Sequence, residues 1–398
     1  MNIYGVVSEF NPFHNGHEYL LNKINNFSKN NIIIVALSSS FVQRGEPGFL
    51  TKWQRTELAL KGGANLVVEL PFVFSCQNAE IFSLGAIGIL NNLNITDLVF
   101  GSETDEIQKL INIAKVLLTN NPSYDKLLKE KLQSGTSFIV SRNESLLESD
   151  MLNSEDIEIL SKPNNILGIE YIKSVLKINP NINIKNISRI GVQHDSNITL
   201  NKYSSASYIR NLPRNNPKLK NLVPSYTYKM IQKNKSPDLE KLLDLLKYKF
   251  LIDKDSMKNS LEYEVGVENR FDKYLYDVKS FNEIIDKVSN KRLTKSRIRR
   301  LVISYLLNVE KKDVFKALEN NEYLRILGMD EEGMKYLRKL EKPYITNFKE
   351  IKNHNENVKF IGEIEVKTTN LYSILTNNNI NLDYKRSPII KKWAFAHF

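Results

Sequence analysis

The chain has 398 residues, of which 41% are hydrophobic, 10% aromatic and 25% charged. A chain of this length is longer than one ordinary hydrophobic core supports, so we expect two or three domains. The composition excludes a disordered chain. The formal net charge of +11 favours a polyanionic partner, and nucleic acid is the commonest one for a basic protein. The single cysteine, Cys76, excludes an intramolecular disulfide and a cysteine zinc cluster.

The beginning of the chain, MNIYGVVSEFNPF, predicts a strand rather than a targeting segment. It lacks the basic stretch and the cleavage site of a signal peptide. No run of the sequence approaches the roughly 18 apolar residues that a membrane span needs. We therefore expect a cytoplasmic protein that does not bind membranes, and no pattern in the sequence predicts a stable protein partner.

The first 115 or so residues alternate short apolar runs with helix-length segments. The pattern predicts strands at residues 3–7, 32–37, 66–70 and 97–100, and helices at residues 17–27, 52–61 and 78–93. Such alternation predicts an α/β fold with a Rossmann-like, doubly wound parallel sheet. The run at residues 184–194 returns to strand character, and we expect it to complete the same sheet.

From about residue 214 the sequence changes to charged, Leu- and Lys-rich segments that predict a mainly α-helical domain. The closely spaced prolines between Pro213 and Pro224 disfavour a continuous helix and indicate a linker. We therefore divide the chain into a first domain at 1–213 and a basic C-terminal domain at 214–398. The pattern of residues 340–398 predicts no particular fold.

The tetrapeptide His14-Asn15-Gly16-His17 lies where the first predicted strand gives way to the first helix. Ligands of doubly wound sheets bind at this edge, where helix N-termini present free N–H groups. The two histidines can donate hydrogen bonds to phosphate oxygens while charge builds during attack at an α-phosphorus. Gly16 lets the backbone approach a phosphate closely, and we expect His17 to open the helix.

Two other interpretations of this tetrapeptide stay open. A His-x-x-His pair can bind a metal, although no third ligand lies nearby in the sequence, and we assign no metal site to protein ligands. Two solvated or core histidines are the other alternative. The position between strand and helix favours the nucleotide site, and neither of the two common glycine-rich phosphate motifs is present to compete with it.

A second motif, SSASYIR at residues 204–210, is a Ser-rich turn that leads to an arginine. Together with HNGH it resembles the HxGH nucleotidyltransferase and class I aminoacyl-tRNA synthetase superfamily. In such enzymes the hydroxyls and N–H groups of this helix start hold the β- and γ-phosphates. The resemblance implies Ser205, Ser207 and Arg210 as contacts, because Ala206 replaces one hydroxyl. Alone, a Ser-rich turn is more often only a helix cap.

Further blocks resemble one family, the bacterial tRNA(Met) cytidine acetate ligases. They are SEFNPFHNGHEYL, SSSFVQRGEPGFLTKWQRTELALKGGANLVVELPFVFS, FGSE at 100–103 and PNNILGIEYIK at 163–173. The resemblance implies a ligase that forms acetyl-adenylate from acetate and ATP, with Mg²⁺ arriving on the ATP. The acetyl group then passes to the N4 amine of the wobble cytidine of elongator tRNA(Met), which gives N4-acetylcytidine.

Two other functions stay open on the motifs alone. HNGH and SSASYIR would also fit an adenylyltransferase acting on a small phosphorylated metabolite, which leaves the basic helical half without a task. The other alternative is a non-enzymatic RNA-binding protein that keeps the nucleotide-binding fold but has lost its activity. The presence of both histidines argues against such a loss of chemistry.

The resemblance also implies which residues contact ATP, with His14 and His17 as the catalytic pair. The ATP-binding residues that it implies are Val7, Ser8, Glu9, Phe10, Asn11, Pro12, Phe13, His14, Asn15, Gly16, His17, Glu18, Tyr19, Leu20, Gly101, Asn164 or Asn165, and Arg189. Asn164 is equally expected as a helix N-cap. Arg189 is equally expected as a surface residue paired with an acid.

Acetyl transfer to an anticodon base requires a basic surface for the RNA phosphates. The spacing of Arg292, Lys295 and Arg299 places them on one helix face, with Ile298, Leu301 and Tyr305 facing inward. The residues that we assign to tRNA binding are Arg44, Lys295, Arg297, Arg299 and Arg300. A charge run is usually only a solvated helix face, and Arg44 can equally be a solvated loop residue.

Overall fold

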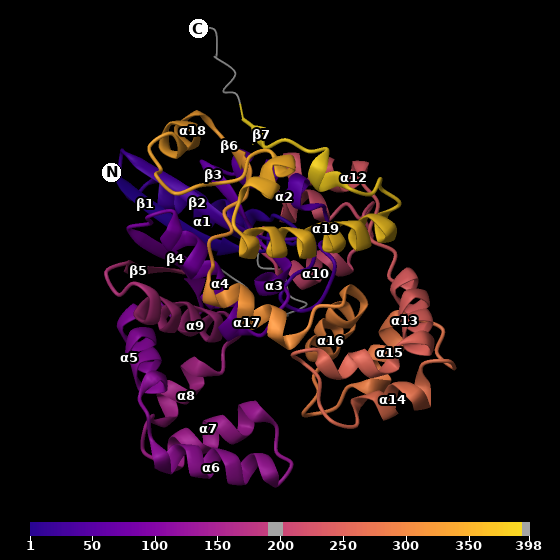
Figure 1. Cartoon of the computed structure of the whole chain (residues 1–398). Coiled ribbons are helices and arrows are strands. Elements are labelled where there is room, and N and C mark those ends of the chain that lie inside the picture. Colours follow the sequence, from indigo (N-terminus) through magenta and orange to yellow (C-terminus); the bar gives the residue numbers. More distant parts are fainter. Residues whose placement is uncertain (190–201, 392–398) are drawn as a thin grey trace, which may run out of the picture.

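The structure is a computed structural model that describes residues 1–189 and 202–391. Figure 1 shows a sheet flanked by helices, with the helices from α13 to α16 grouped to one side and the pair α6 and α7 projecting below. The strands are β1 (Asn2–Ser8), β2 (Asn31–Ser38), β3 (Leu66–Leu70), β4 (Asp97–Ser102), β5 (Asn183–Ser188), β6 (Ile326–Met329) and β7 (Ile389–Ile390).

The helices up to residue 189 are α1 (Asn15–Asn25), α2 (Lys52–Lys61), α3 (Phe72–Ser75), α4 (Ala79–Asn92), α5 (Ile107–Leu118), α6 (Pro122–Gln133), α7 (Phe138–Glu148), α8 (Ser154–Leu160) and α9 (Pro163–Ile178). Those from residue 202 on are α10 (Ala206–Asn211), α11 (Leu219–Leu222), α12 (Ser225–Lys233), α13 (Glu240–Ile252), α14 (Val267–Tyr274), α15 (Phe281–Val288), α16 (Lys295–Leu307), α17 (Lys311–Glu319), α18 (Glu331–Leu337) and α19 (Glu356–Thr376). Short 3₁₀ turns are η1 (Lys254–Asn259), η2 (Phe348–Asn353) and η3 (Leu382–Tyr384).

The described strands form one sheet in the order β5-β4-β1-β2-β3-β6-β7. The first five are parallel, β6 runs antiparallel to β3, and β7 runs parallel to β6. In β2, every residue from Ile32 to Ser38 is buried, as expected for a strand covered by helices on both faces. The predicted doubly wound α/β fold followed by a mainly helical half is therefore confirmed.

The elements of the N-terminal half follow the predicted pattern, with one shift. Each of the four predicted strands is present, and β5 joins the sheet as expected. Residues 190–194 of that last predicted run lie outside the described residues. The first helix begins at Asn15 and not at His17, because the His14 side chain caps it by accepting the Gly16 N–H.

The second half of the chain returns to the sheet of the first. Strand β6 pairs with β3, and the long helix α19 packs against α3. The predicted linker is also packed, because α11 lies within it and buries Leu219 and Leu222. The division of the chain at residue 213 stays a prediction.

A buried ion network that includes Glu69 of β3 ties the two halves of the chain together. Lys52 Nζ lies 2.5 Å from Glu69 and 2.8 Å from Asp383, and Arg325 Nη1 lies 2.5 Å from Asp383 and 3.2 Å from Glu69. Burial acts to lower the pKa of Lys52, but Asp383 and Glu69 outweigh it and raise that pKa above its ordinary value. Charges this deep persist only when they are paired, so each partner requires the others.

Within the two described ranges, no helix combines the length and the apolar character that crossing a bilayer requires.

Candidate active site

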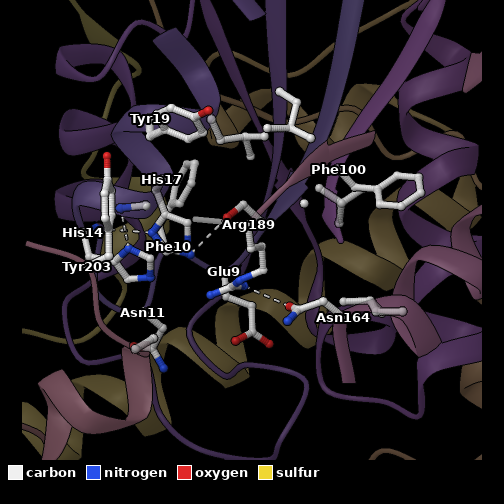
Figure 2. A pocket seen from close by; sticks show the side chains of 18 of the residues that line it. Glu9, Phe10, Asn11, His14, His17, Tyr19, Phe100, Asn164, Arg189 and Tyr203 are labelled. Carbon is white, nitrogen blue, oxygen red and sulfur yellow. Dashed lines mark hydrogen bonds between the residues drawn. The ribbon is translucent and has the colours of Figure 1, made fainter. Parts of the chain in front are cut away.

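A pocket opens at the carboxyl ends of β1, β4 and β5 (Figure 2). Its walls come from the β1–α1 turn, from α9, and from the segment that leads into α10. Helices α1 and α10 both begin beside it, so the positive ends of their dipoles lie there. This is the edge at which the sequence predicts a nucleotide site.

The turn between β1 and α1 is fixed by apolar anchors. Phe10 and Phe13 are fully buried, and their rings pack edge to face with centroids 4.9 Å apart. Phe10 adopts a φ of 45°, and the Asn11–Pro12 peptide bond is cis. Asn11 Oδ1 accepts the Phe49 N–H at 2.6 Å, which ties the turn to the loop after β2. The histidines that follow are therefore held on a rigid support.

The two histidines of HNGH form a reciprocal cap at the start of α1. His14 Nδ1 accepts the Gly16 N–H at 3.0 Å, and His17 Nδ1 accepts the His14 N–H at 3.3 Å. Their rings stack with centroids 3.7 Å apart. Because each Nδ1 accepts a backbone N–H, each neutral ring carries its proton on Nε2. Both imidazoles are thus set to donate from Nε2.

Burial, together with the nearby His14 and Arg189, lowers the pKa of His17 well below its ordinary value. His17 is therefore neutral at pH 7 in the ligand-free protein. A neutral imidazole donates one hydrogen bond without bringing a desolvated charge into the pocket. The negative charge of a bound phosphate would favour the protonated form of His17, and this would strengthen the hydrogen bond between them.

Gly16 has a packing role. A Cβ at this position would lie 2.9 Å from Cε1 of the His14 ring. The glycine therefore makes room for the stacked His14 side chain, in addition to lining the pocket. Its predicted close approach to a phosphate stays a prediction.

The two asparagines at the start of α9 have different environments. Asn164 lines the pocket, and its Oδ1 accepts Arg189 Nη1 at 3.0 Å (Figure 2). Asn165 is fully buried, where it donates to Ile159 O at 3.1 Å and accepts the Glu103 N–H at 2.9 Å. Asn164 is thus the one whose side chain reaches the cavity.

Glu103 explains the orientation of both asparagines. Its carboxylate accepts the N–H of Asn164 at 3.1 Å and that of Asn165 at 2.8 Å, which neutralises the positive end of α9. Since Lys162 is the N-cap residue of α9, the alternative of an N-cap role for Asn164 is wrong. Burial lowers the pKa of Arg189 while Glu103 opposes the shift, and Arg189 faces the pocket and not the open surface.

The SSASYIR motif begins α10 beside the pocket. Ser205 is the N-cap residue, since its Oγ accepts the Tyr208 N–H at 3.1 Å, and it lies 3.0 Å from Ser207 Oγ. Arg210 donates to Asn11 O at 2.9 Å and to Glu46 at 3.0 Å. The arginine therefore joins the HNGH turn to the loop after β2.

Most of the predicted ATP contacts line the pocket. The predicted residues that line it are Val7, Ser8, Glu9, Phe10, Asn11, His14, Gly16, His17, Tyr19, Leu20, Gly101, Asn164 and Arg189. The predicted residues outside its lining are Pro12, Phe13, Asn15, Glu18, Asn165, Ser205, Ser207 and Arg210. Asn15, for example, donates to Lys202 O and Asn221 O, each at 2.8 Å, so its amide holds the fold together.

The sequence did not identify the apolar part of the pocket. Its members are Phe82, Phe100, Leu167, Tyr171 and Ile187, and further unpredicted lining residues are Ser188, Tyr203, Ser204 and Ala206. Phe82 and Tyr171 have the spacing of ordinary core positions on α4 and α9, so periodicity cannot separate them from the core. Ser204 lies within the quoted motif, and its position there was the available signal.

The pocket also holds polar atoms that lack partners among the described residues. Asn11 Nδ2 and Ser204 Oγ are buried without any hydrogen bond to the described chain. Buried polar groups are normally satisfied, so these two atoms suit a polar ligand. A nucleotide triphosphate, which has many acceptor oxygens, fits this donor set. Within residues 1–189 and 202–391, no group of three His, Cys, Asp or Glu residues is placed to hold a metal ion.

The basic turn at the start of α16 is largely neutralised by acidic side chains. Arg300 is buried at 8% exposure, and its Nε lies 2.6 Å from Glu262. Arg297 pairs with Glu264 at 2.8 Å, and Arg299 lies 3.5 Å from Glu46. Because Arg300 is buried, an RNA phosphate at the surface cannot reach it, and its contact with Glu262 supports the fold.

The remaining tRNA-binding candidates are more accessible. The Lys295 side chain is 56% exposed and pairs with Asp286 at 2.8 Å. Arg44 is partly exposed in the loop after β2. The inward face of α16 is as predicted, since Ile298, Leu301 and Tyr305 are all buried.

Comparisons with known proteins agree with the fold. The family model described as HIGH Nucleotidyl Transferase matches residues 1–387. A tRNA(Met) cytidine acetate ligase of Caldicellulosiruptor bescii is 35% identical and covers 98% of each chain, and one of Clostridium botulinum is 36% identical over 98% of this chain and 99% of its own.

A crystal structure of Thermotoga maritima TmcAL bound with alpha-thio ATP superposes with a TM-score of 0.90. It is 33% identical and covers 98% of this chain and 99% of its own. The fold and the histidine pair define a nucleotidyltransferase. The chain belongs to the HIGH nucleotidyl transferase family and, within it, to the tRNA(Met) cytidine acetate ligases.

Proposed function

We propose that this protein is an ATP-dependent tRNA(Met) cytidine acetate ligase. It activates acetate as acetyl-adenylate and passes the acetyl group to the N4 amine of the wobble cytidine of elongator tRNA(Met). The observation that carries the proposal is the reciprocally capped His14–His17 pair, which lines the pocket at the carboxyl end of β1.

The adenylation step follows from this arrangement. An acetate oxygen attacks the α-phosphorus, pyrophosphate leaves, and negative charge grows on the phosphate oxygens. Nε2–H donors on a rigid helix start stabilise that charge without reorganising during the reaction. Arg210 and the α10 helix start are the proposed contacts of the departing phosphates, and Gly101, Asn164 and Arg189 those of the nucleoside.

Mg²⁺ belongs to the proposal as a companion of the triphosphate. When bound it would neutralise charge on the phosphate oxygens, and it needs few protein ligands because the phosphates and water supply most of them. Asn11 and Ser204, whose polar atoms lack partners in the described chain, are additional proposed contacts of ATP. We place the reaction in the cytoplasm, where ATP and tRNA meet.

The proposed tRNA surface includes Arg44, Lys295, Arg297 and Arg299, with Arg300 holding that surface in place from beneath. The net charge of +11 supports a polyanionic substrate. These side chains can still attract RNA phosphates although acidic residues pair with some of them, because an ion pair on a protein surface is weak.

A single incubation tests the function. Protein, ATP, labelled acetate and bulk tRNA are combined, and the tRNA is digested and analysed for N4-acetylcytidine. We expect label in the cytidine of tRNA only when ATP is present. Pyrophosphate release with a phosphorylated metabolite but never with acetate would instead favour a metabolite adenylyltransferase, and no ATP turnover at all would favour a non-enzymatic RNA-binding protein.

A further inference from the structure

The carboxyl group of Glu9 has no task in the adenylation step described above. Glu9 directly follows β1 and lines the same pocket as His14 and His17. Its Oε1 accepts the Gln43 N–H at 2.9 Å, whereas among the described residues no donor reaches Oε2. Figure 2 shows the carboxylate lying between Asn11 and Asn164 in this view. One oxygen therefore anchors the group and the other is available to a ligand.

We expect the carboxylate of Glu9 to accept a hydrogen bond from an N–H or O–H group of a substrate. The triphosphate and acetate are both anions, so a buried carboxylate beside them costs repulsion. The substrates of the proposed reaction bring only a few N–H and O–H groups. They include the ribose hydroxyls and adenine amine of ATP, and the N4 amine and ribose 2′-hydroxyl of cytidine, and of the two cytidine groups only the N4 amine reacts with the acetyl carbon.

The sheet order separates these candidates. Strand β1 lies between β4 and β2, with β5 beyond β4. Gly101 and Arg189, the proposed nucleoside contacts, lie at the β4 and β5 side. Glu9 is tied to the opposite side through Gln43, whose carbonyl oxygen also accepts Arg300 Nη1 of α16 at 3.2 Å. Glu9 thus stands where the nucleotide pocket meets the side that carries Arg44 and the basic turn of α16.

We propose that Glu9 Oε2 recognises the N4 amine of the incoming cytidine and accepts its proton during acetyl transfer. This inference rests on the proposed function. The N4 lone pair forms a C–N bond to the acetyl carbon, the bond from that carbon to the adenylate oxygen breaks, and AMP leaves with the electron pair. The N4 proton passes to Glu9 and is later released to water, so no other reactant is needed.

The same contact selects the base. A carboxylate accepts a hydrogen bond from the N4 amine of cytosine, whereas uracil presents the O4 acceptor at that position and is repelled. Recognition and proton transfer therefore use one oxygen, and only a base that can react is held against it.

The surroundings of Glu9 suit a proton acceptor. Burial raises the pKa of Glu9, which the Gln43 N–H, Arg210 and Arg44 oppose and Glu46 reinforces. The other titratable groups that sense it are Arg55 on α2, Cys76 after α3 and Tyr171 on α9. A general base works best when its pKa lies close to the working pH, and an upward shift brings a carboxyl group in that direction.

The test separates the two half-reactions in the full-length protein. Glu9→Gln keeps the size and the acceptor for Gln43 N–H but removes the base, and Glu9→Asp withdraws the carboxylate. Adenylate formation is followed by acetate-dependent exchange of pyrophosphate into ATP. Transfer is followed in a single turnover, with preformed acetyl-adenylate and tRNA transcripts carrying either C34 or U34. Glu158→Gln, at an exposed side chain of helix α8, is the matched control, since its pairing with Lys162 lies outside the pocket.

We expect Glu9→Gln to slow transfer by about 100-fold or more, the usual contribution of a general base, with a far smaller loss in exchange. The rise of the transfer rate with pH should disappear, Glu9→Asp should retain part of the rate, and the preference for binding C34 over U34 should narrow. An equal loss in both half-reactions would assign Glu9 to ATP or its Mg²⁺ and overturn the inference, as would unchanged transfer. A wild-type protein that exchanges pyrophosphate but acetylates no tRNA would overturn the proposed function itself.

Discussion

Two helix starts in this protein carry conspicuous positive or ionisable residues, and the structure uses them in opposite ways. At the start of α1, the Nδ1 atoms of His14 and His17 accept backbone N–H groups, and both side chains line the pocket. At the start of α16, Arg297 and Arg300 are met by Glu262 and Glu264. The number of basic residues in a segment therefore does not reveal its free charge, which depends on acids that are distant in the sequence.

The largest effect is expected at α1. His17→Ala removes the Nε2–H donor and should slow acetate-dependent pyrophosphate exchange by about 100- to 1,000-fold, the usual cost of losing one such donor. Binding of tRNA, measured by filter retention, should change little. His354→Ala, which alters a histidine next to α19, is the control. Equal losses in exchange and in tRNA binding would mean that His17 supports the fold and not the chemistry.

The next effect concerns α16. Arg300→Ala removes the nearer partner of the buried Glu262, which keeps only Arg297 at 3.4 Å, and should lower the free energy of unfolding by about 2 kcal/mol in denaturant titrations. Lys295→Ala, at the first residue of the same helix and with a side chain that is 56% exposed, should cost less than about 1 kcal/mol. If both substitutions lower the free energy of unfolding by similar amounts, the burial of Arg300 makes no difference to stability and this prediction is wrong.

A smaller effect is expected from pH. The pKa of His17 is lowered in the folded protein. Below about pH 6.5, His17 therefore binds a proton in the unfolded chain but not in the folded one. Stability should therefore fall as pH drops below 6.5 and continue to fall until His17 titrates in the folded state. Between pH 7 and 5.5, wild type should lose about 1 kcal/mol more than His17→Asn, as followed by thermal or denaturant unfolding of the ligand-free proteins. Identical curves would indicate that His17 is freely solvated.

The smallest effect concerns RNA affinity. Lys295→Ala should weaken tRNA binding a few-fold and reduce the slope of log affinity against log salt by somewhat less than 1. Lys115→Ala, an exposed lysine on α5, is the matched control and should leave that slope unchanged. If both substitutions leave the slope intact, the start of α16 takes no part in phosphate contact.

The parts that the sequence predicted are those with local signals. The strands at residues 32–37 and 66–70 were found because continuous apolar runs mark strands buried on both faces. The histidine pair was found because its motif lies between a strand and a helix. The family resemblance then named Gly101, Arg189 and one of Asn164 and Asn165, and of these Gly101, Arg189 and Asn164 line the pocket.

The parts that the sequence missed depend on partners far along the chain. Asn164 and Asn165 could not be told apart, because Glu103 sets which of them turns to the pocket. The partner of Arg300 is Glu262, which no periodicity connects to it. Strand β6 is only four residues long and exists because β3 offers it an edge.

The buried ion network has a consequence for synthesis on the ribosome. Lys52 and Glu69 are made early, but Arg325 and Asp383 emerge only when the chain is almost finished. Until then the nascent N-terminal half holds charges in its interior that have no complete set of partners, and β3 has no neighbour on its outer edge. A prematurely terminated product should therefore fail to mature into a stable catalyst, which would leave quality-control proteases free to remove it before it engages tRNA.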